Sequence, residues 1–263
     1  MSSLSVTPTS TEPRIRAAIA QAASRTGVDF GYLYNQARIE SGLDPQAKAR
    51  TSSATGLFQF TKQTWLQVVK SHGADHGASW AANAISRAGS RLTVADLQLR
   101  SAIDNLRYDP EFASAMAGEF ASDNRDRIEP GLGRSVEPVD LYLAHFLGSA
   151  GASTFLAAHN ADPEAAAAPL FPAAAAANRT IFYGAGGAPR SLNDIRANFA
   201  AKLGGVAPPA ASAPPRQWTQ TERTTVDSAS RASLQMATIE PLPQSLSLEF
   251  AARAYRRLAG LDV

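Results

Sequence analysis

The stretch that decides the fold runs from Asp29 to Pro45 and reads DFGYLYNQARIESGLDP. Its apolar residues recur at the three- and four-residue intervals of a helix. Asp29 stands just before the first of them, as an N-cap residue does, and Gly42 stands where a glycine commonly ends a helix. The pattern therefore predicts an amphipathic helix that stops just beyond Glu40.

Glu40 is an unusual residue for its place in this helix. It follows Ala37 by three residues and Leu33 by seven, so it lies on the apolar side. Burial and the negative end of the helix dipole both disfavour an anion there, and we expect a raised pKa for its carboxyl group. Cleavage of a glycosidic bond needs such a protonated acid. Position alone favours the commoner alternative, a solvated glutamate that bends outward at a helix end.

The sequence on both sides of this helix also favours helices. Helical spacing over 14–25 predicts one before it, and strand-like alternation is nearly absent. Turn-forming residues dominate 44–60, with a short strand or hairpin expected around 56–60. We predict an all-α fold with at most a short β-hairpin near that loop. Further helix starts are expected at Thr61, at a capping box over Thr93–Asp96, at Asp109-Pro110, at Pro138 and at a second capping box over Ser191–Asp194.

Composition divides the chain into four parts. We predict a disordered N-terminus over 1–12, a compact domain over 13–205, a disordered Pro/Ser/Thr-rich linker over 206–244 and an amphipathic C-terminal helix over 245–263. That helix would either dock on its own domain or serve a partner or a membrane surface.

Charge and cysteine content exclude several classes of function. The net charge is +2 with scattered Lys and Arg, which does not indicate nucleic-acid binding. The absence of cysteine excludes thiol chemistry and disulfides. His72 and His76 have a spacing that can hold a metal, but the flanking Gly73 and Gly77 favour a surface loop, so we predict no metal and no cofactor. Neither a signal peptide nor a transmembrane segment is expected from the pattern.

Two motifs that follow one another in the chain resemble those of a known family. The first is Ile39-Glu40-Ser41-Gly42-Leu43-Asp44-Pro45; the second is Ser53-Ala54-Thr55-Gly56-Leu57-Phe58-Gln59-Phe60, followed by Thr64-Trp65. Together they resemble the Glu-Ser and Gly-Leu-Met-Gln elements of the soluble lytic transglycosylase (SLT domain) family, with Phe58 in place of Met. The resemblance implies a lysozyme-like fold over 13–205 and Glu40 as the catalytic acid/base.

The resemblance also implies where substrate would bind. It places Ser41 beside the acid, Gln59 near the acetamido group of the substrate, and Phe58 and Phe60 along the groove, with Ser53 where the family more often has Gly. Residues 144–148, Ala-His-Phe-Leu-Gly, stand in the place of the family's Ala-Tyr-Asn-Ala-Gly motif. His145 would then supply an aromatic edge and a hydrogen bond, or be a packed core histidine. Tyr183 corresponds to a groove tyrosine, or to ordinary packing.

For function, the resemblance implies a lyase that cleaves peptidoglycan glycan strands with a single acid/base and leaves 1,6-anhydro-muramic ends. A hydrolytic muramidase remains an alternative if Asp44, Asp109 or Glu111 holds a water opposite Glu40. A non-catalytic wall-binding or assembly protein is another. We expect a monomer that is periplasmic or secreted by a non-classical route, with a possible cytoplasmic pool and with secretion or flagellar machinery as partner of the C-terminal tail.

Overall fold

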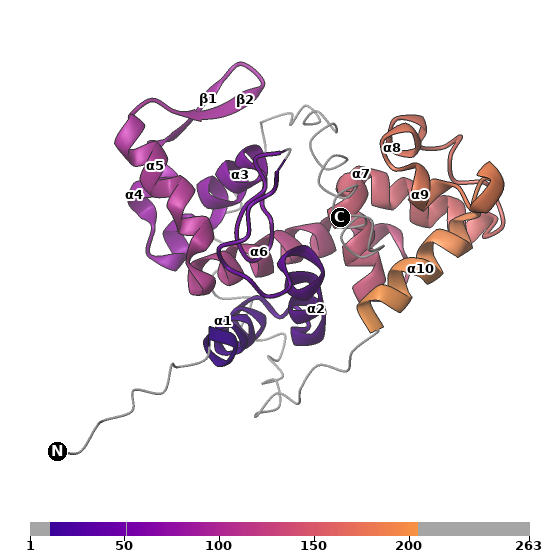
Figure 1. The fold of residues 1–263 in the computed structure, drawn as a ribbon, viewed down its shortest axis with the longest axis horizontal. Helices are drawn as coiled ribbons and strands as arrows, with labels where there is room; N and C mark the ends of the chain where they lie inside the picture. The colour runs from indigo at the N-terminus through magenta and orange to yellow at the C-terminus, as the bar shows by residue number, and fades with distance from the viewer. Residues whose placement is uncertain (1–10, 51, 205–263) are drawn as a thin grey trace.

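The computed structural model describes residues 11–50 and 52–204, and these residues form a mainly helical fold (Figure 1). The predicted all-α class is confirmed. The predicted linker and C-terminal helix, and residues 1–10 of the predicted disordered N-terminus, lie outside the described residues. The elements are α1 (Thr11–Thr26), α2 (Phe30–Ser41), α3 (Lys62–His72), η1 (Gly73–His76), α4 (Ser79–Ala84), β1 (Ile85–Ala88), β2 (Arg91–Val94), α5 (Leu97–Asn105), η2 (Leu106–Tyr108), α6 (Pro110–Ile128), η3 (Glu129–Gly131), α7 (Pro138–Ala161), α8 (Pro172–Ala177), α9 (Arg179–Phe182), η4 (Ala185–Gly187) and α10 (Leu192–Gly204).

Side-chain caps fix most of the helix starts that the sequence predicts. The Asp29 carboxylate accepts a hydrogen bond of 2.7 Å from the backbone N–H of Tyr32 and so starts α2. Asp109 caps α6 in the same way, and Thr61 caps α3. Ser191 and Asp194 form the expected reciprocal box before α10.

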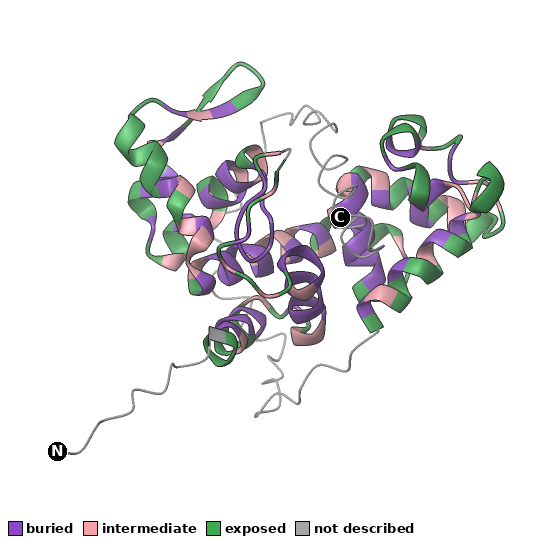
Figure 2. Ribbon diagram, in the orientation of Figure 1, coloured by how far each residue is buried: buried purple, intermediate pink, exposed green. Residues whose placement is uncertain are grey.

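The helix α6 runs through the middle of the molecule (Figure 1). It packs against α1, α2, α3 and α7, and α10 covers the other side of α7. The inward faces of these helices are buried, as the purple segments of Figure 2 show. Trp65 and Phe155 are among the largest fully buried side chains, and the indole N–H of Trp65 donates to the carbonyl of Ile103. One continuous apolar core thus supports α2 from behind.

The long helix α7 is apolar enough, by length and composition, to cross a membrane. Half of its most apolar window is nevertheless buried inside the fold. Gly148 also interrupts its helical backbone, with a φ of 75°. We therefore interpret α7 as a core helix. Its start is held by Asp140, which accepts hydrogen bonds from Arg134 and from Arg196 of α10.

The β-hairpin lies away from the place where the sequence predicted it. Strands β1 and β2 pair antiparallel, with Ile85 opposite Val94, whereas residues 56–60 form turns with isolated bridges from Thr55 to Lys48 and Phe60. The predicted capping box at Thr93 is therefore wrong: Thr93 belongs to β2, and Asp96 caps α5 instead. Gln63 of α3 holds β2 by two hydrogen bonds of 3.0 Å to the backbone of Leu92.

The segment from His72 to His76 is helical, so the expected surface loop is wrong. His72 lies between two carboxylates of α6: its Nε2 is 3.1 Å from Asp123 and its Nδ1 is 3.5 Å from Glu119. His76 contacts Glu119 at 2.8 Å. Among the described residues, no group of three or more His, Cys, Asp or Glu side chains could hold a metal ion.

These contacts predict that His72 stabilises the fold in a pH-dependent way. The hydrogen bond to Asp123 raises the pKa of His72 against the opposing effect of burial, and the charges of Asp123, Glu119 and Asp75 raise it further. A raised folded-state pKa means that the stabilisation is complete below the unfolded pKa, about 6.5, and is lost as the pH rises through the folded value. We expect the difference in unfolding temperature between wild type and His72→Gln to shrink between about pH 6 and pH 8.

The variant Asp123→Asn provides the control for this measurement. Asparagine keeps the shape of Asp123 but removes its charge. The Asp123→Asn protein should therefore lose most of the pH-dependent stabilisation that His72 provides in the wild type. A difference between wild type and His72→Gln that is equal at both pH values would contradict the prediction.

Candidate active site

The end of α2 places Glu40 inside the protein. Leu33 and Ala37, on the same side of the helix, are completely buried, and Glu40 itself is 3% exposed. Gly42 ends the helix in the left-handed conformation, with a φ of 65° and its N–H donating to the carbonyl of Arg38. The prediction that Glu40 lies on the buried side of α2 is therefore confirmed by the structure.

Two buried tyrosines lie close enough to Glu40 to respond to its charge. Burial raises the pKa of Tyr32, and the negative charge of Glu40 raises it further. The pKa of Tyr142, on α7, is raised by the same two causes and by Tyr32. Both hydroxyl groups therefore stay neutral, and the carboxyl group meets no charge from these two tyrosines.

His145 approaches Glu40 from α7. Its Nε2 is 3.4 Å from Oε1 of Glu40, and its Nδ1 is 3.2 Å from the amide nitrogen of Gln36. Gln36 stands one helical turn before Glu40 on α2, so the same helix face supplies both groups. Gln36 was not among the predicted site residues, although its four-residue spacing from Glu40 was a usable signal.

Ser41 ties the end of α2 to the loop at 56–60. Its hydroxyl lies 2.8 Å from the carbonyl of Leu57 and 3.0 Å from that of Ala37. Gln59 also serves the loop, since its amide nitrogen donates to the carbonyls of Ala47 and Gly56. The contacts that the described structure gives these two side chains are internal, and their expected contact with substrate stays a prediction.

The other residues of the loop contribute to the core and to the turn. Phe58 and Phe60 are buried, and the ring of Phe60 packs against Trp65 and Phe120. Ser53 is exposed, and its hydroxyl accepts a hydrogen bond from the first backbone N–H of α3. Substrate contacts of these three residues likewise stay predictions.

Arg107, which was not among the predicted site residues, holds the loop from the far side. It is 5% exposed, donates to the carbonyls of Ser53 and Phe60, and pairs with Asp104. Its own carbonyl lies so close to Gly56 that an added Cβ would be 2.0 Å away. No local pattern indicates this role, because Arg107 lies about fifty residues farther along the chain.

Tyr183 lies elsewhere in the fold. It follows α9 and is half buried, with the Arg179 guanidinium 4.8 Å from the centre of its ring. Its backbone bridges to Pro189. None of the contacts described for Tyr183 reaches Glu40, so its place in a groove stays a prediction.

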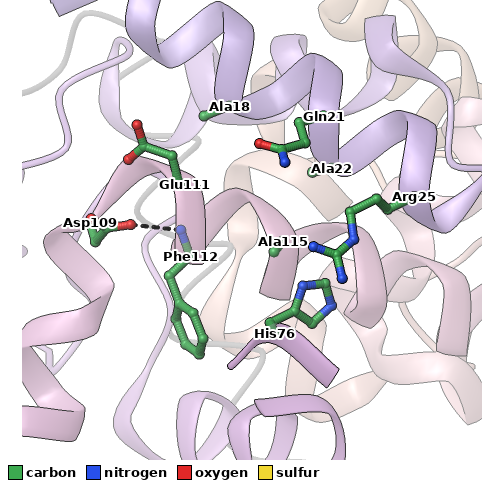
Figure 3. A pocket seen from close by; sticks show the side chains of 9 residues that line it. All are labelled: Ala18, Gln21, Ala22, Arg25, His76, Asp109, Glu111, Phe112 and Ala115. Carbon is green, nitrogen blue, oxygen red and sulfur yellow. Dashed lines mark hydrogen bonds between the residues drawn. The ribbon is translucent and has the colours of Figure 1, made fainter. Parts of the chain in front are cut away.

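A separate pocket of about 270 Å³ lies between α1 and the start of α6, beside His76 (Figure 3). It does not include Glu40. Its charged groups already have structural partners: Asp109 caps α6, Glu111 pairs with Arg14, and His76 contacts Glu119. We therefore place the candidate active site at Glu40 and not in this pocket.

A mainly helical domain, with one buried glutamate ending a helix beside a glycine-containing loop, defines the lysozyme-like class that the sequence predicted. Residues 17–91 match the family model described as the transglycosylase SLT domain. The match includes Glu40, Ser41 and the loop at 56–60, and it ends before His145 and Tyr183. At the level of the family, it indicates a transglycosylase-type activity on peptidoglycan.

Proposed function

We propose that the protein is a lytic transglycosylase that cleaves the β-1,4 bond between N-acetylmuramic acid and N-acetylglucosamine. Glu40 acts as the only acid/base. The observation that carries this proposal is that Glu40 is buried on the apolar side of α2, within a matched SLT domain. Burial favours the protonated acid, which the first step requires.

The carboxylates that might have assisted Glu40 have other roles in the structure. Asp44 accepts a hydrogen bond from the backbone of Gln46 in a turn. Asp109 caps α6, and Glu111 forms two hydrogen bonds with Arg14. A hydrolase normally uses a second carboxylate to hold or activate water. Because these three carboxylates already have structural partners, their positions support the lyase reaction over hydrolysis.

The proposed reaction has two steps. In the first, Glu40 donates its proton to the leaving oxygen, the bond from C1 of the muramoyl residue breaks, and the substrate's own acetamido oxygen bonds to C1. In the second, the Glu40 carboxylate takes the proton of the C6 hydroxyl, and this oxygen displaces the acetamido oxygen from C1. Glu40 is protonated again, no water is consumed, and a 1,6-anhydro ring closes.

Analysis of the chain ends made from purified peptidoglycan tests the proposal. We expect the digest to contain 1,6-anhydro-muramic ends and no excess of free reducing ends over an untreated sample. Mass spectrometry separates the two products, because the anhydro end lacks one water. New free reducing ends in place of anhydro ends would show a hydrolytic muramidase instead.

This activity requires that the protein meet its substrate. Peptidoglycan lies outside the cytoplasm, so we propose that the protein acts in the periplasm or outside the cell. The expected export route, and the expected role of residues 245–263 in it, rest on this requirement alone.

A further inference from the structure

Three side chains from two helices form a connected row at the candidate active site. Gln36 and Glu40 come from α2, and His145 comes from α7, 109 residues after Gln36. The His145 ring contacts Gln36 through Nδ1 at 3.2 Å and Glu40 through Nε2 at 3.4 Å. Each imidazole nitrogen thus faces a different polar group of the same helix.

The Gln36 contact determines where the imidazole proton lies. An amide nitrogen donates hydrogen bonds and cannot accept them, so Nδ1 of His145 must accept. A neutral imidazole that accepts at Nδ1 carries its proton on Nε2. This proton is therefore on the nitrogen that faces Oε1 of Glu40.

The His145 ring is held in this place by aromatic neighbours. Its centre lies 6.0 Å from that of Tyr142 and 6.4 Å from that of Phe120, the latter in an edge-on arrangement. The side chain is 9% exposed. The ring is therefore fixed by packing from α6 and α7 as well as by Gln36.

We propose that His145 is a positioning residue that holds Oε1 of Glu40 through its Nε2–H, with Gln36 fixing the tautomer. The inference rests on the proposed function, since it assigns a role within that reaction. At 3.4 Å this contact does not meet the geometry of a hydrogen bond. Catalytic contacts of this kind commonly shorten and align when substrate binds.

This arrangement suits a Glu40 that first donates a proton and later accepts one. With the proton on Oε2, Oε1 is a carbonyl oxygen and accepts from Nε2–H. After the proton has left, Oε1 is a carboxylate oxygen and accepts a stronger, charge-assisted hydrogen bond. His145 therefore favours proton delivery to the leaving group without changing its own protonation. Besides His145 itself, α2 and α7 place the hydroxyl groups of Tyr32 and Tyr142 within reach of the Glu40 charge, and both stay neutral.

Two variants of His145 separate a donor from a packed ring. In His145→Gln the side-chain amide can place a donor near the position of Nε2, whereas His145→Phe keeps an aromatic ring without any donor. We expect His145→Phe to lower kcat about 100-fold, the size of effect that misplacing a catalytic group produces, with KM changed less than about threefold. His145→Gln should recover at least about tenfold of that loss. The alkaline limb of the pH–rate profile, where Glu40 loses the proton that the first step requires, should move to higher pH in His145→Phe, since the carboxylate loses a donor.

A role in packing alone would give a different result. His145→Phe, which keeps the ring, would then have a kcat at least as high as that of His145→Gln, and the pH profile would not move. That result would overturn the proposal. Unfolding temperatures of both variants show whether they are folded at the assay temperature.

The tautomer can be measured without any activity. We expect ¹⁵N NMR of histidine-labelled protein to show His145 protonated on Nε2 and unprotonated on Nδ1, with the signals assigned by their loss in His145→Gln. Gln36→Met replaces the amide donor by an apolar side chain of similar length. In this variant the His145 ring should no longer be held in the Nε2-protonated tautomer alone. A wild-type ring protonated on Nδ1 would overturn the inference even if the lyase activity is present. Correct NMR signals in a protein that releases no anhydro products would instead count against the proposed function.

Discussion

We expect the Glu40→Gln protein to release almost no anhydro-muropeptides from purified peptidoglycan. Glutamine has nearly the shape of glutamic acid, but it cannot give up or take a proton in this reaction. One general acid–base group contributes about 10²- to 10⁴-fold to a rate, and Glu40 is needed in both steps. We therefore expect the rate to fall by about 10³- to 10⁴-fold.

The same substitution should leave the fold and the binding of peptidoglycan intact. Glu40 is 3% exposed, and replacing a buried ionisable group by a neutral one removes a cost of burial. The unfolding temperature should therefore not fall markedly. Binding is measured by co-sedimentation with insoluble peptidoglycan, and release of soluble products is measured by chromatography.

A matched control is Glu164→Gln, the same chemical change at an exposed position outside the candidate site. It should keep wild-type activity. Full activity in Glu40→Gln would end the proposal that this residue is catalytic and would favour a non-catalytic wall-binding protein. Loss of activity together with loss of folding would show that Glu40 is needed for structure.

Local sequence signals correctly predicted the helix that carries Glu40. Asp29 and Gly42 set the two ends of α2, and the spacing from Leu33 and Ala37 put Glu40 on the buried side. These features depend on residues within one or two helical turns of each other, so the order of residues determines them.

Contacts between distant parts of the chain could not be predicted in this way. Thr93 looked like a helix cap, but pairing with β1 and the hydrogen bonds from Gln63 to Leu92 place it in a strand. His145 was expected either to contact substrate or to pack in the core, and only the packing of α7 brings it to Glu40 and Gln36. The hydrogen bonds from Arg107 to the carbonyls of Ser53 and Phe60 likewise could not be predicted from local sequence.

Gly56 provides the second test with a large expected effect. Its φ is 81°, a conformation that costs other residues about 1–2 kcal/mol. A Cβ there would also lie 2.0 Å from the backbone oxygen of Arg107 and 2.9 Å from its carbonyl carbon. The loop or η2 would have to move, and such overpacking typically costs a further 1–3 kcal/mol or so. We expect Gly56→Ala to lose about 2–5 kcal/mol of stability, a large part of that of an ordinary domain.

Gly42→Ala separates the close approach from the backbone conformation. Gly42 has a similar φ of 65°, but nothing lies within 4 Å of an added Cβ. Its alanine variant should therefore lose only about 1–2 kcal/mol, the cost of the left-handed conformation alone. Chemical denaturation of both variants gives the two values. Equal losses would mean that the contact with Arg107 is not tight in solution. A much larger loss at Gly56 would show that Arg107 and the loop are packed backbone to backbone, which explains why this loop requires glycine next to Leu57.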